Sequence, residues 1–251
     1  MNSILRVDNL SAGYGKDIII NGISLEVFEG EIAVLIGPNG GGKSTFLKAI
    51  LGEVTLFSGN VYICDNELKS ISAKERSKKI AMLSTQRLDL EHITVYEVVA
   101  MGRYPYTGFM GVLTDDDRSV IERAMERTSI AELKDKYYDQ LSDGQKQRVM
   151  LTRAICQEPK LLIMDEPTSY LDINHKIELL YLLKKLSREE GMTILMTLHD
   201  IEYVNQIADK VWAISKDGKL CKLDTNEAFP QSDSIRKLFN INIDHMEYIN
   251  G

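Results

Sequence analysis

Hydrophobic residues follow two different spacings along the chain, and each spacing predicts a different kind of strand. Apolar and polar side chains alternate from Ile4 to Leu10 and from Gly22 to Phe28, which predicts two half-buried strands. Other stretches are apolar almost throughout, as expected of strands buried on both faces. These stretches lie at 31–36, 161–164, 193–197 and 211–215.

Amphipathic stretches separate the buried strands. One of them carries Ile173, Ile177, Leu180 and Leu183, whose spacing predicts an apolar stripe along one face of a helix. Buried strands that alternate with helices indicate an α/β domain built on a largely parallel sheet.

The segment 87–155 shows helical spacing and no buried strand. Thr94 and Thr114 each precede a periodic stretch and can act as N-caps, and a third helical run extends from Gly144 to Cys156. We therefore expect a helical insert in the α/β core.

A loop rich in aromatic residues is expected between the first two of these helices, at 102–111 (GRYPYTGFMG). Pro105 and three glycines prevent regular structure there. The rings fit two interpretations, an exposed docking surface or a turn whose rings fold back on the core.

The end of the chain is less informative. From about residue 216, the sequence DGK predicts a turn between short strands, and a helix is expected at 232–239. We expect no disulfide, because the three cysteines are far apart and odd in number.

Length and charge restrict the class of protein. The chain has 251 residues, 44% of them hydrophobic, which suffices for a core of its own. Its formal net charge of −7 argues against nonspecific nucleic-acid binding, because a negative field repels phosphate. The sequence contains neither an apolar run long enough to span a bilayer nor a recognisable signal peptide. We therefore expect a cytosolic protein without a nucleic-acid partner.

A phosphate-binding motif lies between the buried strand 31–36 and the helical run TFLKAIL. It fits the pattern G-x-x-x-x-G-K-[ST], in which backbone N–H groups of the loop and of the following helix face phosphate oxygens. Its residues are Gly37, Pro38, Asn39, Gly40, Gly41, Gly42, Lys43, Ser44 and Thr45. We expect Lys43 to contact the β and γ phosphates, Ser44 to bind Mg²⁺, and Thr45 to help hold the loop.

Two further strands end in groups suited to phosphate chemistry. Asp165 and Glu166 follow the apolar strand 161–164, and His199 follows the strand 193–197. We expect Asp165 to hold Mg²⁺ through water and Glu166 to orient or deprotonate the attacking water. Parallel strands deliver functional groups at their carboxyl ends, which favours a γ-phosphate contact for His199.

At residues 141–149 the sequence LSDGQKQRV resembles the signature motif of the ATP-binding cassette (ABC) ATPases, and the order of the motifs is that family's order. The resemblance extends over nearly the whole chain. It implies a P-loop NTPase core with a mostly parallel sheet, an antiparallel β subdomain and a helical insert. The single domain 1–251 would divide into a nucleotide-binding core, 1–86 and 156–251, and a helical subdomain, 87–155.

The resemblance also assigns roles that the residue types alone do not. Tyr14 matches the aromatic residue that stacks on adenine. Gln86 matches the glutamine that contacts Mg²⁺ and the attacking water, and His199 matches the switch histidine. Residues 170–172, Tyr-Leu-Asp, correspond to the loop that meets the partner's phosphate site.

A composite site is implied by the family. Two copies would sandwich two ATP molecules, with Ser142, Gly144 and Gln145 of each copy facing the γ phosphate held by the other. Asp143 departs from the glycine that the family commonly has there. A carboxylate facing a phosphate would cost about 1 kcal/mol or more, so we expect Asp143 to point outward or to cap its helix. Gly41 stands where a small non-glycine residue is common, and it should loosen the loop.

Two segments resemble the ATPases of importers for ferric siderophores, haem and cobalamin. The first is 91–111 with the helix that follows it, and the second is SYLDINHKIELLYLL, which begins at Ser169. The implied function is an ATPase at the cytoplasmic face of the membrane that drives an integral membrane permease, fed by a substrate-binding protein. The segment 103–106 would face the permease. Alternatives are an ABC ATPase for a metal ion or an exported lipid, or a non-transport member such as an iron-sulfur assembly scaffold.

Overall fold

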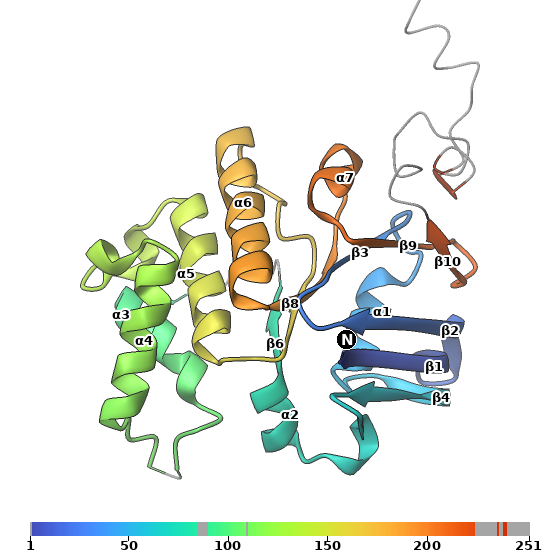
Figure 1. The fold of residues 1–251 in the computed structure, drawn as a ribbon, viewed down its shortest axis with the longest axis horizontal. Coiled ribbons are helices and arrows are strands. Elements are labelled where there is room, and N and C mark those ends of the chain that lie inside the picture. The colour runs from blue at the N-terminus through green and yellow to red at the C-terminus, as the bar shows by residue number, and fades with distance from the viewer. Residues whose placement is uncertain (1, 85–89, 109, 224–234, 236–237, 240–251) are drawn as a thin grey trace, which may run out of the picture.

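The computed structural model describes residues 2–84, 90–108, 110–223, 235 and 238–239. Figure 1 shows an α/β molecule in which a central sheet separates a group of helices from a second, antiparallel sheet. This architecture confirms the α/β fold expected from the alternation of buried strands and helices.

The central sheet has six strands in the order β10-β9-β3-β8-β7-β6. Its strands are β3 (Ile32–Ile36), β6 (Ile80–Leu83), β7 (Leu161–Met164), β8 (Thr193–Thr197), β9 (Lys210–Ile214) and β10 (Leu220–Leu223). All neighbouring pairs are parallel except β10 with β9. Every residue of β3, β7 and β8 is buried, as their unbroken apolar sequences predict.

The second sheet is antiparallel, with the order β2-β1-β4-β5. Its strands are β1 (Ser3–Tyr14), β2 (Asp17–Phe28), β4 (Thr55–Ile63) and β5 (Asn66–Glu67). The alternating sequences of β1 and β2 pair over most of their length, for example Val7 with Leu25. The two half-buried strands predicted near the N-terminus are therefore confirmed.

Most helices lie on the side of the central sheet away from β1 and β2 (Figure 1). The helices are α1 (Lys43–Ile50), α2 (Ala73–Lys79), α3 (Val95–Ala100), α4 (Asp115–Arg127), α5 (Asp143–Cys156), α6 (Ile173–Glu190) and α7 (Val204–Ile207). Thr94 and Thr114 cap α3 and α4 in capping boxes, as predicted. The third predicted helix begins at Asp143 rather than Gly144, because the hydroxyl of Ser142 caps it.

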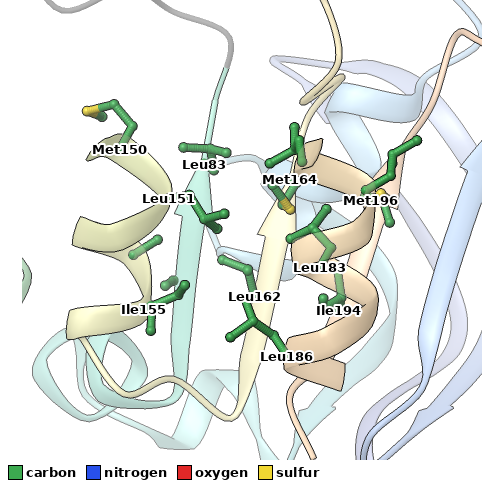
Figure 2. Packing of buried hydrophobic residues seen from close by; sticks show 14 of the residues in the cluster. Leu83, Met150, Leu151, Ile155, Leu162, Met164, Leu183, Leu186, Ile194 and Met196 are labelled. Carbon is green, nitrogen blue, oxygen red and sulfur yellow. The ribbon is translucent and has the colours of Figure 1, made fainter. Parts of the chain in front are cut away.

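Two hydrophobic clusters occupy the two faces of the central sheet. On one face, Phe46 and Leu47 of α1 pack between Leu35 of β3 and the apolar face of β1. On the other face, α5 and α6 lie over β6, β7 and β8, with Leu151, Leu183 and their neighbours packed together (Figure 2). The second cluster also includes Val98 of α3 and Ile121 of α4, so it continues from the sheet into the helical insert.

Helix α6 is buried along only part of its predicted apolar stripe. Leu180 and Leu183 are buried, but Ile173 and Ile177 at its start are 67% and 52% exposed. The helix is where the apolar spacing predicted it, and the second half of the stripe is the part that is buried. Ile177 lines a hollow between α6 and the segment that contains α7, beside Tyr203 and Ile207.

Arg103 lies inside the protein, only 3% exposed. Its Nε donates to Oδ1 of Asp117 at 2.9 Å, and its Nη1 donates to Glu158 at 2.7 Å and to the carbonyl of Cys156 at 2.9 Å. The guanidinium also stacks 3.9 Å from the centre of the Tyr106 ring. Within the segment 103–106, Arg103 therefore packs inside the protein, whereas Tyr104 is 79% exposed.

We predict that Arg103→Met lowers the free energy of unfolding by about 3–5 kcal/mol, because it leaves the buried carboxylate of Asp117 without its partner charge. Burial opposes ionisation of Asp117, yet hydrogen bonds from Thr114 and the pairing with Arg103 hold its pKa below the usual value. Urea unfolding followed by circular dichroism measures the loss. The matched control is Glu158→Gln, which removes a half-exposed partner of the same arginine and should cost at most about 1 kcal/mol. Equal stability of Arg103→Met and the unaltered chain would contradict the prediction.

The remaining expectations concern the end of the chain, the cysteines and the membrane. β9 and β10 are joined by a turn at 216–218, as predicted, whereas most of the helix expected at 232–239 lies outside the described residues. All three cysteines are free. None of the helices within the described part of the chain is long and apolar enough to cross a membrane.

Candidate nucleotide site

The loop 37–42 follows β3 and leads directly into α1. Gly37 has a φ of 152°, and a Cβ there would lie 2.3 Å from the carbonyl oxygen of Ile214, so a larger residue would push the loop off β9. Gly42, the N-cap of α1, has a φ of 98°, a left-handed conformation that glycine adopts without strain. No side chain caps this helix end. Its backbone N–H groups can therefore bind an anion.

Lys43 begins α1 and is only 6% exposed. Its Nζ donates to the carbonyl oxygens of Gly37 and Pro38, at 2.8 and 3.2 Å. Burial lowers the pKa of Lys43, while the negative charges of Glu166 and Asp165 act in the opposite direction. The ammonium group thus lies inside the loop, close enough to both carboxylates to interact with them, and a phosphate could take the place of the two carbonyls.

Asp165 and Glu166 follow β7, and a threonine of β8 holds them in place. The hydroxyl of Thr197 donates to Oδ1 of Asp165 at 2.7 Å and accepts from the backbone N–H of Glu166, also at 2.7 Å. Glu166 has a φ of 47°, a left-handed conformation that costs energy for a residue with a side chain. One buried hydroxyl thus fixes both residues of the turn after β7.

The oxygen groups of this site suit Mg²⁺, a hard cation that takes few protein ligands together with phosphate oxygens and water. Ser44 stands at the start of α1 beside Lys43, and Asp165 keeps Oδ2 available because Thr197 occupies Oδ1. Among the described residues, no three His, Cys, Asp or Glu side chains form a metal cluster of their own. A hydroxyl and one carboxylate therefore fit a cation that arrives with a nucleotide. Gln86, the third predicted ligand, lies outside the described residues.

His199 follows β8 and is exposed. The backbone beside it is fixed, because Leu198 donates to the carbonyl of Leu35 at 3.3 Å. The next residue, Asp200, accepts from Thr168 at 3.1 Å and from Lys176 at 2.7 Å. These bonds connect the turn that carries His199 to the segment between β7 and α6.

The order of strands brings the predicted groups to one edge. β8 lies between β3 and β7 in the sheet, and all three run parallel. The loop with Lys43, the Asp165–Glu166 turn and His199 therefore all follow the carboxyl ends of adjacent strands. This is the arrangement predicted from the sequence.

Tyr14 lies at the hairpin between β1 and β2 and is 47% exposed. The same hairpin reaches the phosphate loop, because a Cβ on Gly42 would lie 2.8 Å from a methyl group of Ile20. An exposed ring on an element that touches the loop is compatible with stacking on a base.

Ser142, Gly144 and Gln145 lie at the start of α5, where Ser142 and Gln145 form a capping box. The backbone N–H of Gln145 donates to the Ser142 hydroxyl at 3.3 Å, and that of Ser142 donates to Gln145 Oε1 at 3.1 Å. In the described part of the chain, no hydrogen bond joins these residues to the phosphate loop.

Asp143 is exposed in the first turn of α5. The N-cap of this helix is Ser142, so the expectation that Asp143 caps it is wrong.

Thr197 is the site residue that the sequence analysis missed. It is fully buried and bonds to both halves of the Asp165–Glu166 turn. The available signal is the polar residue that ends the otherwise apolar stretch TILMT, because a buried hydroxyl requires a hydrogen-bond partner.

Comparisons with known proteins agree with this geometry. Residues 20–169 match the family described as ABC transporter. The chain is 40% identical to an uncharacterised ABC transporter ATP-binding protein of Methanocaldococcus jannaschii, over 98% of this chain and 85% of that protein. It is 37% identical to the iron(3+)-hydroxamate import ATP-binding protein FhuC of Bacillus subtilis, over 96% of this chain and 89% of FhuC.

A solved structure resembles the whole chain. It is that of cbiO1 from Clostridium perfringens, part of the ABC transporter complex cbiONQ. The two are 29% identical, the TM-score is 0.82, and the match covers 100% of this chain and 99% of cbiO1.

Proposed function

Because this chain belongs to the ABC transporter family, we propose that it is the ATP-hydrolysing subunit that drives an integral membrane permease importing a ferric siderophore, haem or cobalamin. The observation that carries the hydrolytic part is the convergence of Lys43, Asp165 and Glu166 at one edge of the central sheet, after β3 and β7. The cargo class is supported by relatives named as import ATP-binding proteins for iron(3+)-hydroxamate and ferric enterobactin.

The site residues divide the chemistry among them. The N–H groups at the start of α1, together with Lys43, hold the β and γ phosphates, and Tyr14 stacks on the base. Ser44, Gln86 and Asp165 would hold Mg²⁺, which would supply charge stabilisation to the phosphates. Glu166 accepts a proton from the attacking water, and His199 contacts the γ phosphate. The products are ADP and phosphate.

Each ATP site needs a second copy of the chain in this proposal. Ser142, Gly144 and Gln145 lie at the N-terminus of a 14-residue helix, whose partial positive charge attracts an anion. They have no hydrogen bond to the phosphate loop of their own copy within the described residues, so they are free to serve the γ phosphate bound by a partner. In the proposed dimer, residues 170–172, which lie just before α6, also approach the partner copy.

The permease would dock beside the helical subdomain, on the loop after α3. Tyr104, Met110 and Val112 are 79%, 85% and 66% exposed, and exposed apolar groups on one loop favour a protein contact. In this proposal the chain lies peripherally at the cytoplasmic face of the membrane, and the substrate-binding protein acts on the permease rather than on this chain.

The experiment that tests the function begins with the chain tagged in its native membranes. We expect a polytopic membrane protein to copurify, and the reconstituted complex to take up ferric hydroxamate, haem or cobalamin when ATP is supplied on the side of this chain. Vesicles carrying the Glu166→Gln chain provide the matched control and should take up none. A soluble complex without a membrane protein, or no uptake of any of the three, would contradict the proposal.

We also predict that hydrolysis per molecule rises with protein concentration, because each phosphate loop must meet Ser142 of another copy. The measurement is phosphate release by the isolated chain over about a thousandfold dilution at saturating ATP and Mg²⁺. A rate per molecule that stays constant down to concentrations at which sedimentation detects only monomer would contradict the composite site.

A further inference from the structure

His175 connects two segments that the proposed function places against the partner copy. It lies in the first turn of α6, and Asp172 is the N-cap of that helix. The backbone N–H of His175 donates to Oδ1 of Asp172 at 2.9 Å, and its Nδ1 lies 2.8 Å from Oδ2 of the same carboxylate. A neutral imidazole that donates from Nδ1 leaves Nε2 directed away from Asp172. One carboxylate therefore fixes both the backbone and the ring of His175.

The ring held in this way lies against Gly144 at the start of α5. A Cβ on Gly144 would lie 2.4 Å from Cδ2 and 2.7 Å from Nε2 of His175. The imidazole thus occupies the space in which a side chain at position 144 would stand, and it packs directly on the backbone of the signature segment. Only glycine allows this close approach.

Two polar contacts strengthen the same junction. Nε2 of Gln147 donates to the carbonyl of Pro167 at 3.0 Å, and Arg148 pairs with Glu178 at 2.5 Å. Gln147 and Arg148 lie in α5, Pro167 follows the Asp165–Glu166 turn, and Glu178 belongs to α6. The Arg148–Glu178 pair joins the bodies of α5 and α6, and the Gln147 bond joins α5 to the segment before α6. His175 is the contact at the N-terminal ends of the two helices.

We propose that His175 is a positioning residue that sets the start of α5 against the loop 170–172, so that both meet the partner copy as one surface. The inference rests on the proposed two-copy site. His175 acts through the backbone at Gly144, on which the direction of the helix N–H groups depends. Loss of the ring leaves a gap beside Gly144, and the first turn of α5 then has more than one position. Within the described residues, no hydrogen bond or ion pair joins His175 to the phosphate loop of the same copy, and we expect that loop to keep its affinity for ATP.

The test uses His175→Ala in the full-length chain that also carries Glu166→Gln, in which ATP remains bound. ATP-driven association is measured by sedimentation velocity, and binding of ATP to dilute monomer by calorimetry. We expect the dimer dissociation constant to rise about tenfold, with unchanged ATP affinity of the monomer and an unchanged unfolding temperature. His175→Phe, which fills the space beside Gly144, should recover part of the association.

Asn174→Ala provides the matched control, because Asn174 is an exposed polar residue of the same turn and should leave association unaltered. Equal dimerisation of His175→Ala and its parent would overturn the inference. An equal loss of association in Asn174→Ala would also overturn it, because the effect would then belong to the N-terminal end of α6 as a whole. Failure of the Glu166→Gln parent itself to associate with ATP would instead refute the two-copy site.

Discussion

Glu166→Gln should reduce ATP hydrolysis at least about 100-fold while leaving ATP binding intact, because it removes the carboxylate proposed to take the proton from the attacking water. The amide has nearly the same shape as the carboxylate. Two bonds that hold the turn, from the backbone N–H of Glu166 to Thr197 and from the Ser169 backbone N–H to the carbonyl of Glu166, do not involve the altered group. The Ser169 hydroxyl donates to Oε2 of Glu166 at 3.3 Å, a bond that the amide oxygen of glutamine can also accept. ATP should therefore bind. The two-copy complex should persist, because the bond between the β and γ phosphates, whose cleavage would release the complex, is not broken.

The measurement combines steady-state phosphate release with size determination in ATP and Mg²⁺. We expect dimer to accumulate in Glu166→Gln and monomer to predominate in the unaltered chain after ATP is consumed. Glu189→Gln, on the exposed surface of α6, is the control for loss of a negative charge elsewhere and should hydrolyse ATP normally. Turnover by Glu166→Gln within a factor of two of the unaltered chain would remove Glu166 from its proposed role.

Lys43→Ala should act one step earlier and weaken nucleotide binding itself by about 10- to 100-fold, since a hydrogen bond from an ammonium group to phosphate contributes about 1.5–3 kcal/mol. Calorimetric titration with ATP and Mg²⁺ gives the affinity directly. Lys43 also donates to the carbonyls of Gly37 and Pro38, so its removal could loosen the loop. The unfolding temperature separates loss of the phosphate contact from loosening of the loop. If ATP affinity falls and the unfolding temperature does not change, the lost affinity comes from the phosphate contact.

Lys48→Ala is the matched control for this change. Lys48 belongs to the same helix but is exposed, so its removal should leave affinity unchanged. An affinity of Lys43→Ala equal to that of the control would show that the ammonium group does not contact the phosphates.

Much of the fold could be predicted because it depends on local patterns. The alternation in β1 and β2, the apolar runs of β3, β7 and β8, and the caps at Thr94 and Thr114 all specify structure within a few residues of themselves. The convergence at the sheet edge followed from one rule, that parallel strands deliver their following loops to the same side.

The parts that could not be predicted depend on residues distant in sequence. Apolar spacing shows which face of α6 is hydrophobic but not that Ile173 and Ile177 on that face stay exposed. Arg103 is buried because Asp117 and Glu158, 14 and 55 residues away, neutralise it, and no local pattern predicts that meeting. The contact of His175 with Gly144 likewise depends on how α5 and α6 pack.

The hydrophobic cluster under α5 and α6 has a consequence for motion. It includes Ile32 and Val34 of the central sheet together with Val98 of α3 and Ile121 of α4, so the interior of the helical insert is continuous with that of the sheet. Close-packed side chains permit sliding over short distances rather than swinging about a hinge. We therefore expect ATP binding at the sheet edge to move the insert by a short sliding of α5 across the sheet. Little of that movement would be absorbed by deformation of the side chains in between.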